Sequence, residues 1–124
     1  MTQRILVTGS SGFAGRRLVT ALAGAGHRVL AASRNPGAVG FPEGVAVARL
    51  PNLVERINWS PLLADVSSVV HLAGIAHRGM AVSEEIYDRI NHVAVADLAA
   101  AAARAGVARL IYVCLLYTSP SPHS

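Results

Sequence analysis

Short apolar runs recur along the chain at intervals that suit alternating strands and helices. The first run, Arg4 to Thr8, is largely apolar and leads directly into a glycine-rich loop, which is typical of a strand buried on both faces of a parallel sheet. Further apolar stretches are expected to form strands at residues 27–32, 45–50, 67–72 and 109–113.

Two intervening segments carry apolar residues at the three- and four-residue steps of an amphipathic helix. The first spans residues 13–25, and Gly26 can take the left-handed conformation that ends a helix. The second begins at Ser83, a favourable N-cap, and stops before Gly106. Its apolar face comprises Ile86, Ile90, Val93, Ala94, Leu98, Ala101 and Ala105.

A shorter helix is expected between residues 55 and 64, with Ser60 as its N-cap and Pro61 at its first helical position. Strands that alternate with helices in this way form parallel βαβ units with right-handed crossovers. We therefore expect an open, doubly wound α/β sheet with strand order 3-2-1-4-5. Ligands of such sheets bind beyond the carboxyl ends of the strands where the order reverses, here between the first and fourth strands.

The loop between the first strand and the first helix has the spacing of a phosphate-binding turn. Its glycines suit a sharp turn at Gly9, a close approach to a pyrophosphate at Gly12 and tight packing of helix on strand at Gly15. The N-terminus of the helix would direct its N–H groups and positive dipole end at the same anion. An ordinary strand-to-helix loop is the alternative, but the flanking strand and helix are the context that phosphate binding requires.

Composition narrows the class of protein. The chain has 124 residues, enough for one domain, and is 52% hydrophobic. It lacks a run of the roughly 18 to 20 apolar residues that cross a membrane and lacks a secretory signal pattern; with a single cysteine, Cys114, this favours a soluble cytoplasmic protein. The net charge is +4, but the arginines are scattered, so we expect a solvated surface and no nucleic-acid interface. No metal site is expected.

Three stretches resemble the extended short-chain dehydrogenases, the NAD-dependent epimerase/dehydratase family. They are T-G-S-S-G-F-A-G at 8–15, V-V-H-L-A-G at 69–74 and the segment 90–113, in the order and at the separations typical of the family. The resemblance covers residues 1–113 and implies the N-terminal part of a Rossmann-type dinucleotide-binding domain, truncated after the fifth strand. Trp59 and His77, on either side of the H-L-A-G block, look most like members that act on nucleotide-linked sugars.

The resemblance also assigns cofactor-binding residues by position. These are Gly9, Gly12, Phe13, Ala14 and Gly15 for the pyrophosphate, Ser33 and Arg34 for the adenosine ribose, Leu72, Ala73 and Gly74 beside the ribose units, and Asn91 on the long helix. Many NAD users carry an acidic residue after the second strand, whereas the Arg34 guanidinium would pair with a 2′-phosphate, so we expect a preference for NADP over NAD. A solvated turn, or stacking of Arg34 on adenine, would be compatible with either cofactor.

Three polar residues have alternative roles. His71, in a buried strand, is expected to be a hydrogen-bonded core histidine, with proton transfer as the alternative. Asn91 is expected near the cofactor or the adjoining strand, and its buried amide could have a functional role or a purely structural one. Asn52 stands near the place where many family members direct an aspartate at the adenine amine, and its amide oxygen could accept the same bond.

The family transfers hydride through nicotinamide with a tyrosine, a lysine four residues later, and a serine or threonine. All 11 basic residues of this chain are arginines, so it cannot supply the lysine; we assign no catalytic residue and expect the chain alone to be inactive. Residues 114–124 are low in complexity and resemble peptide translated from a sequencing adapter. We expect them to be disordered and the authentic reading frame to end near Val113, with a native tail as the alternative.

These expectations combine into one functional hypothesis. The chain would be the NAD(P)-binding half of a nucleotide-sugar epimerase, dehydratase or 4-ketoreductase, whose full-length form binds a dinucleotide and a nucleotide sugar, with a homodimer as one option. A non-catalytic dinucleotide sensor is the alternative, and a basic nucleic-acid-binding domain is a third. A Tyr-x-x-x-Lys motif downstream would favour the enzyme, and its absence the sensor.

Overall fold

The computed structural model is a parallel sheet covered by helices on both faces. It describes residues 4–38, 40–55, 57–73 and 83–113. The strands are β1 (Arg4–Thr8), β2 (Arg28–Ser33), β3 (Ala46–Arg49), β4 (Val66–His71) and β5 (Arg109–Tyr112). They form a five-stranded sheet in the order β3-β2-β1-β4-β5, and every neighbouring pair is parallel. The predicted fold class and strand order are therefore confirmed.

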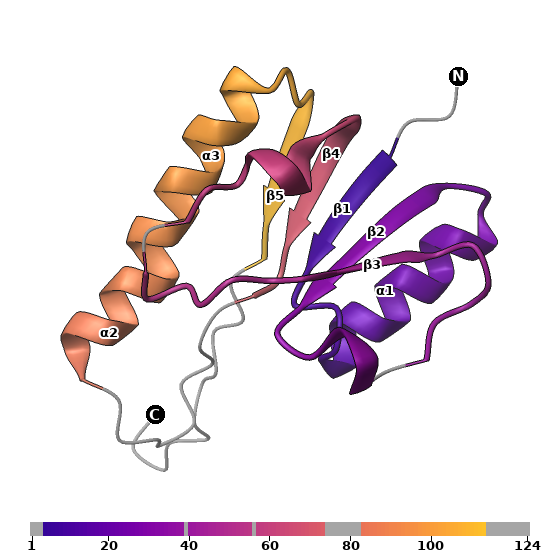
Figure 1. The fold of residues 1–124 in the computed structure, drawn as a ribbon, viewed down its shortest axis with the longest axis horizontal. Coiled ribbons are helices and arrows are strands. Elements are labelled where there is room, and N and C mark those ends of the chain that lie inside the picture. The colour runs from indigo at the N-terminus through magenta and orange to yellow at the C-terminus, as the bar shows by residue number, and fades with distance from the viewer. Residues whose placement is uncertain (1–3, 39, 56, 74–82, 114–124) are drawn as a thin grey trace, which may run out of the picture.

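Successive side chains of the central strand β1 alternate between two separate cores, as the pleat of a strand requires. Val7 lies in the core under α1 (Phe13–Gly24), and Leu6 lies in the core under α3 (Ala94–Arg104). Figure 1 shows α1 on one side of the sheet and α3 on the other. In the described ranges, no helix is both long enough and apolar enough to cross a membrane.

The long C-terminal helix is present but not uniform. It begins as α2 (Glu84–Asp88), with the Ser83 hydroxyl accepting the N–H of Ile86 at 3.1 Å as its N-cap. A π-helical turn at Arg89–Val93 then joins it to α3. Because apolar residues at three- and four-residue steps suit both kinds of helix, the spacing in the sequence does not reveal the wider turn.

The short helix expected between residues 55 and 64 is present as a single 3₁₀ turn with Pro61 near its start, but its predicted cap is wrong. Only Ser60–Leu63 is helical, as a 3₁₀ turn, and its N-cap position is Trp59 without a side-chain cap. Ser60 lies inside the turn because the first hydrogen bond of the turn runs from the Leu62 N–H to the Trp59 carbonyl at 2.9 Å, and the Ser60 N–H donates to the Asn58 amide oxygen at 3.2 Å. An Asx turn, in which the Asn58 side chain accepts the Ser60 N–H, leads into the 3₁₀ turn in place of a cap by Ser60.

The glycine loop brings three backbone segments together where side chains would not fit. Gly9 has a positive φ of 70°, and a Cβ on it would lie 2.8 Å from the backbone nitrogen of Ala73 after β4. A Cβ on Gly15 would overlap the Gly9 carbonyl oxygen and lie 2.8 Å from the Cα of Ser10. The start of α1 and the end of β4 can therefore approach the loop only because these positions carry no side chain.

Gly15→Ala is expected to lower the free energy of unfolding by about 1 to 3 kcal/mol, because the added methyl group must displace backbone. Gly24→Ala is the matched control, since a Cβ at that position would have nothing within 4 Å and alanine favours the helix by about 0.5 kcal/mol. Urea denaturation of both variants measures the difference. Equal stability of Gly15→Ala and the unaltered chain would show that the loop does not pack so closely.

Candidate functional site

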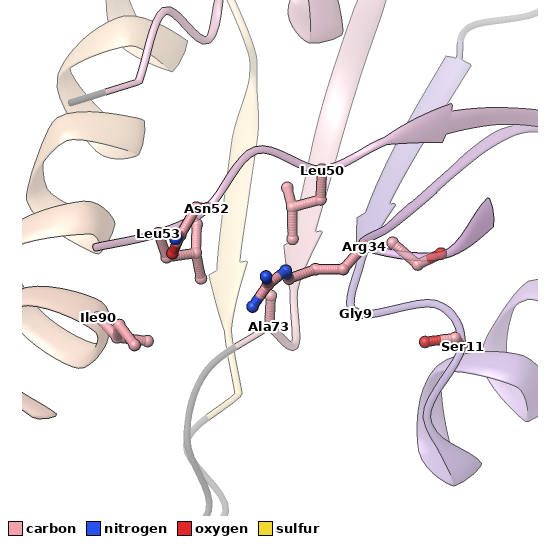
Figure 2. Close-up of a pocket in the computed structure, with 9 residues that line it drawn as sticks. Gly9, Ser11, Arg34, Leu50, Asn52, Leu53, Ala73 and Ile90 are labelled. Carbon is pink, nitrogen blue, oxygen red and sulfur yellow. The ribbon is translucent and has the colours of Figure 1, made fainter. Parts of the chain in front are cut away.

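A cavity of about 220 Å³ lies beyond the carboxyl ends of the strands, where the strand order reverses between β1 and β4. It is lined by Gly9, Ser11, Ser33, Arg34, Leu50, Asn52, Leu53, Ala73 and Ile90. Figure 2 shows Gly9 and Ser11 on one side of it and Asn52, Leu53 and Ile90 on the other. The cavity is thus built from the ends of the central strands, the segment after β3 and the π-helical turn.

The structure brings some of the expected cofactor residues together and separates others. Gly9, Ser33, Arg34 and Ala73 line the cavity, as does Asn52. The remaining described candidates lie outside its lining; they are Gly12, Phe13, Ala14, Gly15, Leu72 and Asn91. Gly74 and His77 fall outside the described residues, as does the expected tail at 114–124.

Sequence reasoning did not select Ser11, Leu50, Leu53 or Ile90 for this site. Ser11 belongs to the glycine loop itself, so its position in the motif was an available signal. Ile90 was assigned to the apolar face of the long helix, and no local pattern distinguishes a core residue from one that lines a cavity. Leu50, Leu53 and Ile90 form an apolar side of the cavity that could be recognised only after the fold had brought the segment after β3 and the long helix together.

The N-terminus of α1 leaves backbone donors near the glycine loop. The first helical hydrogen bond runs from the Arg16 N–H to the Gly12 carbonyl at 2.9 Å, so the amides of residues 13–15 have no acceptor within the helix. No acidic residue lies in the first turn to offset the positive dipole end. The Gly12 N–H donates instead to the Gly9 carbonyl at 3.2 Å, so this amide is already paired within the loop.

The side chain of Phe13 points away from this cavity. It is 69% exposed, with the Arg17 guanidinium carbon 5.2 Å from the ring centroid, and it lines a separate surface hollow. A contact between Phe13 and a ligand in the central cavity would therefore involve its backbone.

The hydroxyl of Thr8 joins the ends of β1 and β4. Its Oγ1 accepts the N–H groups of Leu72 at 3.1 Å and Ala73 at 3.2 Å and lies 2.7 Å from Nδ1 of His71. A hydroxyl has one proton and two lone pairs, so the Thr8 proton goes to Nδ1, and neutral His71 carries its own proton on Nε2. The expected hydrogen-bonded core histidine is confirmed, and it holds Ala73 at the edge of the cavity through Thr8.

Comparison with known proteins agrees with this architecture. Residues 5–114 match the model of the NAD dependent epimerase/dehydratase family. The chain belongs to this family. A 3-beta-hydroxysteroid dehydrogenase of Mycolicibacterium neoaurum is 32% identical over 115 residues, which are 88% of this chain and 31% of that protein.

Solved structures also resemble the chain over a similar extent. MoeE5 in complex with UDP-glucuronic acid and NAD is 31% identical with a TM-score of 0.71, and the match covers 88% of this chain and 36% of that one. The UDP-glucose 4-epimerase of Thermus thermophilus, in complex with NAD, is 26% identical with a TM-score of 0.71, covering 86% and 36%. The chain therefore spans about a third of the length of these relatives.

In this member of the epimerase/dehydratase family, Asn91 lies in the π-helical turn and is buried. Its backbone carbonyl accepts the Tyr112 hydroxyl at 3.2 Å. Because Tyr112 ends β5, this bond ties the turn to the sheet. This contact is made by the Asn91 backbone, so the role of its side-chain amide, at the cofactor or in the structure, stays a prediction.

Burial makes the stability of this domain sensitive to acid through His71. Desolvation lowers the pKa of His71 from 6.5 to about 4. The unfolded chain therefore takes up a proton before the folded one does, and stability falls as the pH drops from 6.5 toward 4. We expect a loss of about 2 kcal/mol between pH 7 and pH 5 from this group.

Urea denaturation across that pH range measures the effect. His71→Gln should be less stable at pH 7 but should lack this part of the pH dependence. The control His27→Gln, at an exposed position after α1, should keep the slope of the unaltered chain. An equal slope in His71→Gln would contradict a neutral His71 in the fold.

Proposed function

We propose that this chain is the NAD(P)-binding part of a longer nucleotide-sugar epimerase, dehydratase or 4-ketoreductase. The observation that carries the proposal is that the cavity and the free amides of α1 meet at the glycine loop, where Gly9 and Ser11 line the cavity. A dinucleotide needs these two features side by side: an anion site for its pyrophosphate and a hollow for its adenosine.

The amides at the start of α1 and the cavity would each bind a different part of the cofactor. The amides of residues 13–15 would bind the pyrophosphate, since they lack helical acceptors and lie at the positive end of the dipole. The adenosine would enter the cavity, where Leu50, Leu53 and Ile90 supply apolar contact for a flat ring. Ala73 would lie beside the ribose units, and its small side chain leaves room for them.

The charge of the cavity supports NADP as the preferred cofactor. Its nine described lining residues include the guanidinium of Arg34 and no carboxylate. Figure 2 shows the Arg34 side chain extending across the cavity toward Ala73. Arg49 donates to the Arg34 backbone carbonyl at 2.9 Å and so helps to hold that segment in place. A guanidinium in this position favours a 2′-phosphate over a free ribose hydroxyl.

The nucleotide-sugar assignment rests on the solved relatives. MoeE5 was solved with UDP-glucuronic acid and with UDP-glucose, and both complexes also contain NAD. Because this chain has no lysine, the proton-transfer pair would lie in the part of the protein beyond it. Reading the gene past the codon for Val113 tests this: a Tyr-x-x-x-Lys motif there supports the enzyme, and its absence supports a dinucleotide sensor.

Titration with NADP and NAD tests the cofactor preference. The unaltered chain is expected to bind NADP more tightly, and Arg34→Gln should weaken NADP binding by about tenfold with little effect on NAD, because only NADP offers a 2′-phosphate. Arg109→Gln removes the same charge at the amino end of β5, away from the cavity, and should change neither affinity. Tighter binding of NAD than of NADP by the unaltered chain would refute the preference.

A further inference from the structure

One wall of the cavity consists of two segments that are far apart in the sequence. Leu50, Asn52 and Leu53 follow β3, and Ile90 belongs to the π-helical turn; together we call these four residues the base-side wall. Figure 2 shows Asn52, Leu53 and Ile90 on the side of the cavity away from the glycine loop. The shape of the base-side wall therefore depends on how the segment after β3 is held against the π-helical turn.

Arg89 connects the two segments directly. Its Nε donates to the backbone carbonyl of Val54 at 2.7 Å, in a partly buried hydrogen bond between residues 35 positions apart. A hydrogen bond from a charged donor is stronger than one between neutral groups. Since Ile90 is the next residue, the same bond holds the neighbouring parts of the base-side wall together.

The turn that Arg89 holds also fixes the side chain of Asn52. The Asn52 amide oxygen accepts the Val54 N–H at 3.1 Å, and the Asn52 carbonyl accepts the Glu55 N–H at 3.1 Å. Val54 is thus bound through its N–H to Asn52 and through its carbonyl to Arg89. As long as Val54 stays in place, the Asn52 amide cannot turn over, because its nitrogen would then face the Val54 N–H.

A fixed amide presents one pattern of donor and acceptor to the edge of a base. An amide free to turn over would suit a 6-amino purine and a 6-oxo purine alike, since it can offer either its oxygen or its NH₂ group. We propose that Arg89 is a positioning residue for base recognition, which acts through Val54 to hold the Asn52 amide in one orientation in the base-side wall. The inference rests on the proposed binding of a dinucleotide in this cavity.

Affinities for NADP and for its hypoxanthine analogue test this role, because the analogue replaces the 6-amino group with an oxygen. The unaltered 124-residue chain should discriminate between them. Arg89→Met keeps an unbranched apolar stem that reaches about as far as Nε but removes the guanidinium and its donors. Of NADP and its analogue, the ligand that the unaltered chain binds more tightly is expected to lose about tenfold in affinity. The ratio of the two affinities should therefore move toward one.

Two further variants separate positioning from general stability. Arg89→Lys retains a donor for the Val54 carbonyl and should recover part of the discrimination. Arg104→Met removes an exposed arginine near the end of α3 and should leave both affinities unchanged. Thermal denaturation of each variant records any loss of stability alongside the affinities.

The outcomes distinguish this inference from the function on which it rests. If the unaltered chain binds neither dinucleotide, the proposed function fails and the role of Arg89 fails with it. If the chain binds them but Arg89→Met preserves the ratio, whether or not stability falls, then only the positioning role is overturned.

Discussion

The close approach of β1 and β4 at their carboxyl ends is the constraint on which the site depends. The Thr8 hydroxyl binds the first two amides after β4, and Gly9 leaves no side chain between the loop and Ala73. A larger residue at Gly9 would force the two strand ends apart and move the glycine loop away from the other walls. This contact places Gly9 and Ala73 side by side in the lining of the cavity at the reversal of strand order.

Burying His71 has an energetic cost and a structural benefit. Its ring lies near the rings of Trp59 and Tyr112, with centroid distances of 6.2 and 5.7 Å, and its burial disfavours the charged form. In the neutral form Nδ1 can accept the Thr8 proton, which leaves the lone pairs of Thr8 for the amides after β4. The same buried residue therefore makes the domain sensitive to acid, through its desolvation, and orients the Thr8 hydroxyl at the cavity, through its hydrogen bond.

The electrostatic character of the site comes from backbone and side chain together. Unpaired amides at the start of α1 contribute partial positive charge without any ionised group, and Arg34 adds a full charge at the end of β2. Both favour an anionic ligand, but they lie at different parts of the site. The separation suits a ligand that carries a pyrophosphate and a second phosphate on its ribose, which is why we propose NADP.

The sequence alone was sufficient to predict the sheet and its glycine loop. Alternating apolar runs and helical spacing act locally, and the T-G-S-S-G-F-A-G motif requires a strand before it and a helix after it. The Ser60 cap was wrong because the turn begins one residue earlier, with the Leu62 N–H bonded to the Trp59 carbonyl. The π-helical turn was not foreseen because its apolar spacing matches that of an ordinary helix.

Only the tertiary structure decided how distant segments share hydrogen bonds. The tautomer of His71 depends on a threonine 63 positions away, and the orientation of Asn52 depends, through Val54, on an arginine in the long helix. Local patterns predict which segments become strands and helices because short-range sterics and burial govern them. The choice of partner for a buried donor or acceptor is made by whichever group the completed fold places within about 3 Å, and that information is not present in any one segment.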